Sequence, residues 1–157
     1  LKLQSLLEFY LDSEFENFNK KKINFNFIGD ISKFSGVIKK KLKYFKNKTS
    51  HFSNLFFTLA LSYGSRDEIV CAVRKIKKDL GEIYENDITM NLMTNSIPDP
   101  DLVIRTSGEK RLSNFLLWQI AYSELYFTKT LWPEFNISRY TQALENYVSR
   151  KRRFGGD

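Results

Sequence analysis

This 157-residue chain contains two arginines and a serine close together in sequence: Arg105, Arg111 and Ser113. Their side chains are suited to bind an anion. A guanidinium group binds phosphate or carboxylate oxygens through two parallel hydrogen bonds, and the serine adds a hydroxyl donor. Between the arginines, Ser107-Gly108 predicts a turn. Two guanidinium groups and a hydroxyl suit a diphosphate better than a carboxylate, so the spacing predicts a diphosphate site.

The acidic residues nearby have a simpler interpretation, in which the arginines pair on the surface with Glu109, Asp101 or Glu124. Glu124 also has two interpretations of its own. A carboxylate there would help to hold Mg²⁺ against a bound diphosphate, because Mg²⁺ takes one or two carboxylates plus phosphate oxygens. Alternatively, Glu124 is solvated or is a salt-bridge partner.

The elements around the arginines are predicted to bring them to the edge of a sheet. Asp101 to Ile104 is typical of a short buried strand, and Leu125 to Phe127 of another. Ser113 suits the N-cap of a buried helix whose exposed N–H groups would attract an anion. Ligands of parallel α/β sheets bind at the carboxyl ends of the strands, which is where this loop would lie.

The rest of the chain alternates helical and strand patterns. Helical spacing is expected over 3–18, 34–45, 65–80 and 138–150, and strands over 24–28 and 55–61, the second of them buried. Ser65-Arg66-Asp67-Glu68 has the capping-box pattern of a helix start, and that helix is expected to end near Gly81. These elements predict an α/β fold with a mostly parallel central sheet flanked by helices, in a single domain over 1–157.

Composition narrows the class of protein. Hydrophobic residues make up 42% of the chain, which is globular, and one Cys and one His exclude a disulfide framework and a Cys/His zinc site. A reducing, cytoplasmic location is therefore expected. No apolar stretch is long enough to span a membrane. No nucleotide-binding glycine motif or Ser/His/Asp arrangement occurs.

Ten of the lysines that contribute to the net charge of +7 fall between Lys20 and Lys48. The pattern favours a helix that packs its apolar face and solvates its lysines, and the base composition of the source genome is an equally simple explanation for the excess. An anionic membrane surface or a nucleic acid are alternative partners. The nucleic-acid alternative depends on net charge alone, so no nucleic-acid partner is expected.

Four segments resemble the cis-prenyltransferase family, most nearly its bacterial members. The longest is DLVIRTSGEKRLSNFLLWQIAYSELYFTKTLWPEF over 101–135, and the others are IGDISKF, LALSYGSRDEI and RKRRFGG. The resemblance covers essentially the whole chain. It implies condensation of isopentenyl diphosphate with an allylic diphosphate such as farnesyl diphosphate, in the presence of Mg²⁺, to a long-chain polyprenyl diphosphate. Among bacterial members this product is undecaprenyl diphosphate, the lipid carrier for cell-wall synthesis.

The resemblance also implies roles for individual residues. Arg105, Arg111 and Ser113 would bind the isopentenyl diphosphate, with Leu112 between them and Glu109 nearby, and Glu124 matches the magnesium-associated glutamate. The tail, with Arg153 and Gly155, would lie near the active site of the partner subunit of a homodimer. Leu55, Phe57 and Leu59 would line the tunnel for the growing chain. The family's insoluble product also implies a peripheral contact with the inner face of the membrane.

Two departures from the family pattern limit these roles. The Asp-Gly-Asn-Gly-Arg-Trp motif that carries the catalytic Asp, and the Ser-x-Glu-Asn-Trp motif that helps deprotonation, do not occur, so no catalytic residue is assigned in this chain. We therefore expect the C-terminal two-thirds of a catalytic domain, without its N-terminal strand and helices, and no turnover by this chain alone. A non-catalytic subunit that supports an active partner is the alternative. Lys110 also replaces a His of some bacterial members.

Overall fold

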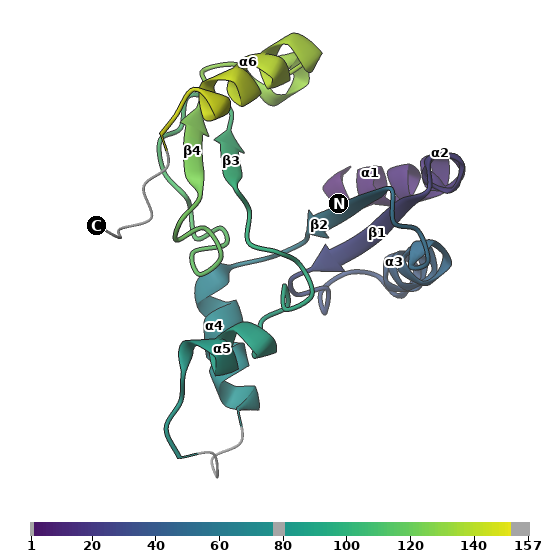
Figure 1. Ribbon diagram of the computed structural model, residues 1–157. Coiled ribbons are helices and arrows are strands. Elements are labelled where there is room, and N and C mark those ends of the chain that lie inside the picture. Colours follow the sequence, from purple (N-terminus) through teal and green to yellow (C-terminus); the bar gives the residue numbers. More distant parts are fainter. Residues whose placement is uncertain (1, 77–80, 152–157) are drawn as a thin grey trace. The chain divides into compact units, whose positions relative to one another are not determined.

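The structure, a computed structural model, describes residues 2–76 and 81–151 (Figure 1). Its helices and parallel strands confirm the predicted α/β class. The chain divides between Tyr63 and Gly64 into two compact units, each with one pair of strands. The prediction of a single domain over 1–157 therefore stays a prediction. Among the described residues, no helix is both long and apolar enough to cross a membrane.

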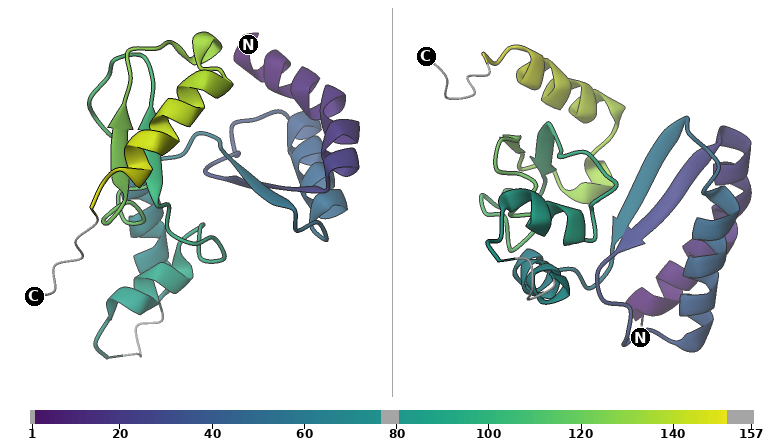
Figure 2. Two further views of the ribbon diagram at one scale, coloured as in Figure 1. Left: turned by 45° about the horizontal axis from the view of Figure 1, so that its top comes forward. Right: turned by 60° about the horizontal axis from the view of Figure 1, so that its bottom comes forward.

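The first unit places three helices against a parallel strand pair. The order is α1 (Lys2–Ser13), α2 (Phe15–Lys21), β1 (Ile23–Ile28), α3 (Gly36–Thr49) and β2 (Leu55–Ala60). β1 and β2 pair in register from Ile23↔Leu55 to Ile28↔Ala60. Figure 2 shows α1 and α3 side by side along this pair. The helix expected over 3–18 is divided into two, α1 and α2, at Glu14. The other helical and strand patterns expected up to residue 61 are confirmed within a few residues at each end.

The apolar stripe of α3 forms the centre of the first unit. Ile38, Leu42 and Phe45 recur at helical spacing and are buried against Leu11 of α1 and Phe25 of β1. The rings of Phe25 and Phe45 stack with their centroids 4.5 Å apart. Most lysines of α3 lie on the other side of the helix, exposed, so the favoured interpretation of the lysine pattern describes how this helix packs.

The prediction that 55–61 is a buried strand is wrong for its first half. Leu55, Phe56 and Phe57 are 55%, 69% and 42% exposed, and only the residues from Thr58 onward are half-buried. Within this unit, α2 and α3 pack on β1 more closely than any helix packs on β2. An apolar run therefore indicated a strand correctly but did not show how far it is covered.

The second unit contains α4 (Ser65–Lys75), α5 (Glu85–Asn91), β3 (Leu102–Arg105), β4 (Glu124–Phe127), a short 3-10 helix (Trp132–Glu134) and α6 (Ile137–Val148). β3 and β4 pair in parallel from Leu102↔Glu124 to Arg105↔Phe127. Figure 1 shows these strands side by side, with α6 near β4 and α4 beside α5. Asn136 caps α6 through its side chain, which accepts from the N–H of Arg139.

No helix follows Ser113, contrary to prediction. Residues 113–122 form successive turns, because Ser113, Asn114 and Leu116 have φ values of +48°, +63° and +47° and so cannot continue a right-handed helix. The main-chain groups here bond instead to α4: the carbonyl of Asn114 accepts from the N–H of Ser65 at 2.8 Å. Tertiary hydrogen bonds thus replace the helical ones that the apolar pattern suggested.

The predicted capping box at the start of α4 is also wrong. Gly64 is the N-cap, and the side chains of Ser65 and Glu68 are fully buried instead of capping the helix. The Ser65 hydroxyl accepts from the N–H of Leu117 at 3.0 Å. The helix ends at Lys75, six residues before Gly81, because Ile76 is extended; residues 77–80, including Leu80 of the predicted face, lie outside the described residues.

The carboxyl group of Glu68 instead organises the centre of the second unit. It accepts from the N–H of Met93 at 2.8 Å and from the amide of Gln119 at 3.0 Å, and the same amide donates to Thr94 at 2.8 Å. All three side chains are buried. Buried polar groups are costly unless they are hydrogen-bonded, so this network fixes the turn segment 113–122 against α4 and the segment after α5.

Candidate functional site

Arg105 is the last residue of β3, and the loop that follows it is tied to the extension of β4. The N–H groups of Ser107 and Gly108 donate to the carbonyls of Thr130 and Thr128 at 2.9 and 2.8 Å. Ser107 and Gly108 have φ values of +69° and +74°, which is the reversal that the Ser-Gly pair predicted. The loop therefore lies at the carboxyl ends of both parallel strands, as expected.

The loop brings Arg105 and Ser113 into direct contact. The guanidinium of Arg105 donates to the hydroxyl of Ser113 at 3.1 Å and to the carbonyl of Arg111. Leu112, which is half-buried, lies between Arg111 and Ser113 in the chain. Both arginines and Ser113 thus belong to one short segment, as the sequence predicted, although no helix N-terminus supports it.

The guanidinium of Arg111 is exposed and forms an ion pair with Glu109. The alternative of surface pairing is thus correct for Arg111, whereas the side chain of Arg105 bonds to a hydroxyl and a carbonyl. An anion that binds to Arg111 competes with the carboxylate of Glu109.

We therefore expect Glu109→Gln to bind inorganic pyrophosphate about threefold more tightly than the unmodified chain, because a negative charge beside the anion is removed. Isothermal titration calorimetry at low salt measures this. Glu134→Gln removes an exposed carboxylate elsewhere in the second unit and is the matched control. Unchanged or weaker binding by Glu109→Gln alone would show that the ion pair supports the site instead of competing for it.

Glu124, the predicted magnesium ligand, lies at the other end of the strand pair. It is paired in register with Leu102, three residues before Arg105, which is about 10 Å along the strand. Its carboxylate forms an ion pair with Arg150 at 2.6 Å, and Arg150 also donates to the carbonyl of Leu125 and to Asn146. The structure therefore contains a salt bridge of Glu124, as one of its two interpretations expected.

The magnesium role of Glu124 stays a prediction. The described residues contain no group of three His, Cys, Asp or Glu side chains arranged to hold a metal ion, and the Glu124 carboxylate is paired with Arg150, but Mg²⁺ also binds through one or two carboxylates together with diphosphate oxygens. Arg153 and Gly155, which the resemblance placed near the site of a partner subunit, lie outside the described residues.

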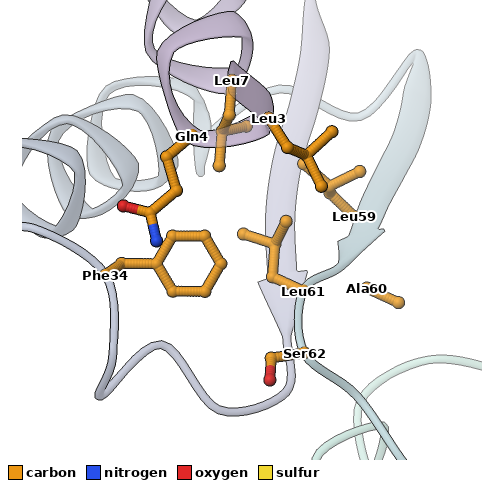
Figure 3. Close-up of a pocket in the computed structure, with 8 residues that line it drawn as sticks. All are labelled: Leu3, Gln4, Leu7, Phe34, Leu59, Ala60, Leu61 and Ser62. Atoms are coloured by element: carbon orange, nitrogen blue, oxygen red, sulfur yellow. The ribbon is translucent and has the colours of Figure 1, made fainter. Parts of the chain in front are cut away.

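The first unit holds an apolar cavity of about 500 Å³ between α1, the segment before α3 and the end of β2 (Figure 3). Its lining residues are Leu3, Gln4, Leu7, Phe34, Leu59, Ala60, Leu61 and Ser62. Leu59, which the resemblance assigned to a tunnel, lines the cavity, whereas Leu55 and Phe57 are exposed nearer the start of β2. A cavity of this size and lining fits a hydrocarbon chain.

The turn after β1 supports this cavity. Gly29 has a φ of +101°, and a Cβ there would lie 2.1 Å from the carbonyl oxygen of Leu61, so only glycine permits this approach. The next residue, Asp30, accepts from the N–H of Ser32 at 2.8 Å and from its hydroxyl at 2.9 Å. These hydrogen bonds, led by the one from the N–H, lower the pKa of Asp30 below its ordinary value.

A second charged contact ties α1 to α3. Lys41 bonds to Asp12 at 2.6 Å and to Glu8 at 2.9 Å. The hydrogen bond that Lys41 donates to Asp12, followed by the one it donates to Glu8, raises the pKa of the Lys41 ammonium above its ordinary value. The helix that carries part of the cavity lining is thereby held against the lysine-rich helix.

Comparison with known proteins decides the family. The family model described as putative undecaprenyl diphosphate synthase matches residues 1–155. This chain belongs to that family. It is 45% identical to the ditrans,polycis-undecaprenyl-diphosphate synthase, farnesyl-diphosphate specific, of Buchnera aphidicola, covering 98% of this chain and 64% of the relative. It is 44% identical to the isoprenyl transferase of Aquifex pyrophilus, covering 98% and 67%.

Two solved structures agree with this fold. Lavandulyl diphosphate synthase from Lavandula x intermedia, solved with dimethylallyl diphosphate, superposes with a TM-score of 0.92 at 36% identity, over 98% of this chain and 70% of that one. A probable undecaprenyl diphosphate synthase from Campylobacter jejuni gives 0.88 at 37% identity, over 97% and 72%. This chain therefore spans about two thirds of the length of the relatives it matches.

Asn114 is a site-forming residue that the sequence patterns did not single out. Its side-chain oxygen accepts from the N–H of Arg66 at 2.9 Å, in addition to the bond from Ser65 to its carbonyl. An Asn inside an apolar, apparently helical run was the available signal, because Asn tolerates the left-handed conformation better than its apolar neighbours do.

Proposed function

We propose that this chain supplies the isopentenyl diphosphate site of a cis-prenyltransferase, which condenses isopentenyl diphosphate with an allylic diphosphate. The observation that carries the proposal is the contact of Arg105 with Ser113 at the carboxyl ends of β3 and β4, beside Arg111. Two guanidinium groups and a hydroxyl provide hydrogen-bond donors and positive charge for a diphosphate. The names of the relatives, which are enzyme names, favour this activity over a non-catalytic subunit.

In the proposed reaction a carbon–carbon bond forms between the two isoprenoids, the allylic carbon–oxygen bond breaks, and pyrophosphate and a proton leave. Arg105, Arg111 and Ser113 would bind and orient the diphosphate of the isopentenyl group, which is retained in the product. Positioning of this kind lowers the entropic part of the barrier. The apolar cavity of the first unit would hold hydrocarbon and exclude water from it.

Mg²⁺ belongs to the proposal as an ion that would accompany the bound diphosphate. When bound, it neutralises diphosphate charge and assists the departure of pyrophosphate. Glu124 is the residue that would hold it, and in this structure its carboxylate is paired with Arg150, so we derive no step through the ion.

The substrates and partners of the proposal follow the family. Farnesyl diphosphate is the allylic substrate in the name of one relative, and the proposed product is undecaprenyl diphosphate, for cell-wall synthesis. The homodimer and the peripheral contact with the membrane stay predictions. Exposed lysines of α3 supply charge of the right sign for anionic lipids: Lys40, Lys43, Lys46 and Lys48.

We expect the 157-residue chain to bind isopentenyl diphosphate and to have no turnover with farnesyl diphosphate, because the motif that carries the catalytic Asp does not occur in it. Calorimetry measures binding, and incorporation of radiolabelled isopentenyl diphosphate measures turnover. Isopentenol, which lacks the diphosphate, is the control and is expected not to bind. Failure to bind isopentenyl diphosphate would refute the proposed site, and measurable incorporation would refute the expected inactivity.

A further inference from the structure

Asn114 connects the diphosphate loop to the first turn of α4. Its carbonyl accepts from the N–H of Ser65 at 2.8 Å, and its Oδ1 accepts from the N–H of Arg66 at 2.9 Å. The first N–H groups of a helix have no partner within the helix, and Gly64, the N-cap, has no side chain to offer them. Asn114 thus caps α4 from a distance of 48 residues along the chain.

The conformation of this residue sets the direction of Ser113. Both Ser113 and Asn114 have positive φ, at +48° and +63°, so the chain turns through two left-handed residues in succession. Such residues are strained unless tertiary contacts hold them. The cap supplies these contacts, and one residue before it the hydroxyl of Ser113 accepts from Arg105 at 3.1 Å.

Packing leaves the side chain of Asn114 little freedom. Its Nδ2 lies 2.8 Å from the place that a Cβ on Gly64 would occupy, so the amide lies directly against the backbone of Gly64. Leu117 adds a further tie, because its N–H donates to the buried hydroxyl of Ser65 at 3.0 Å. The turn is therefore held on both sides of Asn114.

From this geometry we infer that Asn114 is a positioning residue for the diphosphate, acting through Ser113 on the Arg105 guanidinium. The inference rests on the proposed function, since it assumes that Arg105 and Ser113 bind the anion. Without the cap, the turn samples conformations in which the Ser113 hydroxyl is away from Arg105. The apparent affinity for the diphosphate then falls in proportion to the fraction of molecules that keep the Ser113 hydroxyl beside Arg105.

The test is a double-mutant cycle on the full 157-residue chain, with inorganic pyrophosphate as the probe and calorimetry as the measurement. We expect Asn114→Ala to weaken binding about tenfold and Ser113→Ala about fivefold, with the double variant close to Asn114→Ala alone, because coupled residues are not additive. A purely structural role predicts the product of the two effects, about fiftyfold. That product, or unchanged binding by Asn114→Ala, overturns the inference.

Asn136→Ala is the matched control, since it removes another Asn cap from the same unit, at α6. It should lower the melting temperature without changing affinity. If Asn114→Ala is unfolded by circular dichroism, Asn114→Gly takes its place in the cycle; it keeps the left-handed turn and the main-chain acceptor, and about a threefold, non-additive loss is expected. If Asn114→Gly does not weaken binding, or if its effect adds to that of Ser113→Ala, the inference is overturned.

The same experiment separates the two proposals. If the unmodified chain does not bind pyrophosphate, the proposed site and the inference both fail. If it binds, and Arg105→Ala loses binding while the Asn114 variants do not, the inference alone fails.

Discussion

Arg105→Ala is expected to weaken the binding of isopentenyl diphosphate to this chain about 100-fold. The guanidinium lies at the carboxyl end of β3, in contact with the Ser113 hydroxyl. Its loss removes one or two charge-assisted hydrogen bonds to the diphosphate, each worth roughly 1.5–3 kcal/mol. The main chain of the loop is held separately, through Thr128 and Thr130, so the effect should appear in affinity and much less in stability. Calorimetry and thermal unfolding measure the two.

Arg105→Lys tests the geometry of the guanidinium. Lysine keeps the charge but not the two parallel donors, so we expect about a tenfold loss of affinity. Arg74→Ala, which removes an exposed arginine in the last turn of α4, is the matched charge control and should bind nearly as the unmodified chain does. Equal losses for Arg74→Ala and Arg105→Ala would mean that only net charge attracts the ligand.

Glu68→Ala should have the largest effect on stability, with about 3 kcal/mol lost from the free energy of unfolding. The side chain is 2% exposed, and its removal leaves the N–H of Met93 and the amide of Gln119 without this acceptor. Buried donors that lose their partner cost roughly 1–3 kcal/mol each. Urea unfolding followed by circular dichroism measures the change.

Glu68→Gln should lose less, because the oxygen of the Gln119 amide is buried and has no hydrogen-bond partner among the described residues. Rotation of that amide would let this oxygen accept from the new side chain. Asp67→Ala removes the neighbouring exposed carboxylate and is expected to cost below about 1 kcal/mol. If Glu68→Ala were no more destabilising than Asp67→Ala, the network would not stabilise this unit.

The sequence predicted the elements better than it predicted their ends and their burial. The apolar stripe of α3 and the alternation in β1 are local patterns, so they were sufficient for those elements. The exposure of Phe56 was not predictable in this way, because it depends on which strand the helices cover. Ser65 and Glu68 matched a capping box, but both side chains bond to distant main-chain or side-chain groups instead.

The candidate site was likewise predictable only in part. The proximity of Arg105 to Ser113 followed from a short spacing across a turn and is present in the structure. The position of Glu124 was not predictable from spacing, because it depends on the register of β3 with β4 and on its pairing with Arg150, which follows α6. The cap by Asn114 joins residues 48 positions apart, and no local pattern contains that information.

The ion pair between Arg111 and Glu109 has a consequence for ligand selectivity. With its guanidinium already neutralised, binding of an anion is an exchange of one counter-ion for another. A ligand with a single negative charge gains little by that exchange, whereas a diphosphate can contact Arg111 and Arg105 at once. The loop should therefore discriminate against small anions with one negative charge, such as monocarboxylates, and it would do so through the carboxylate of Glu109.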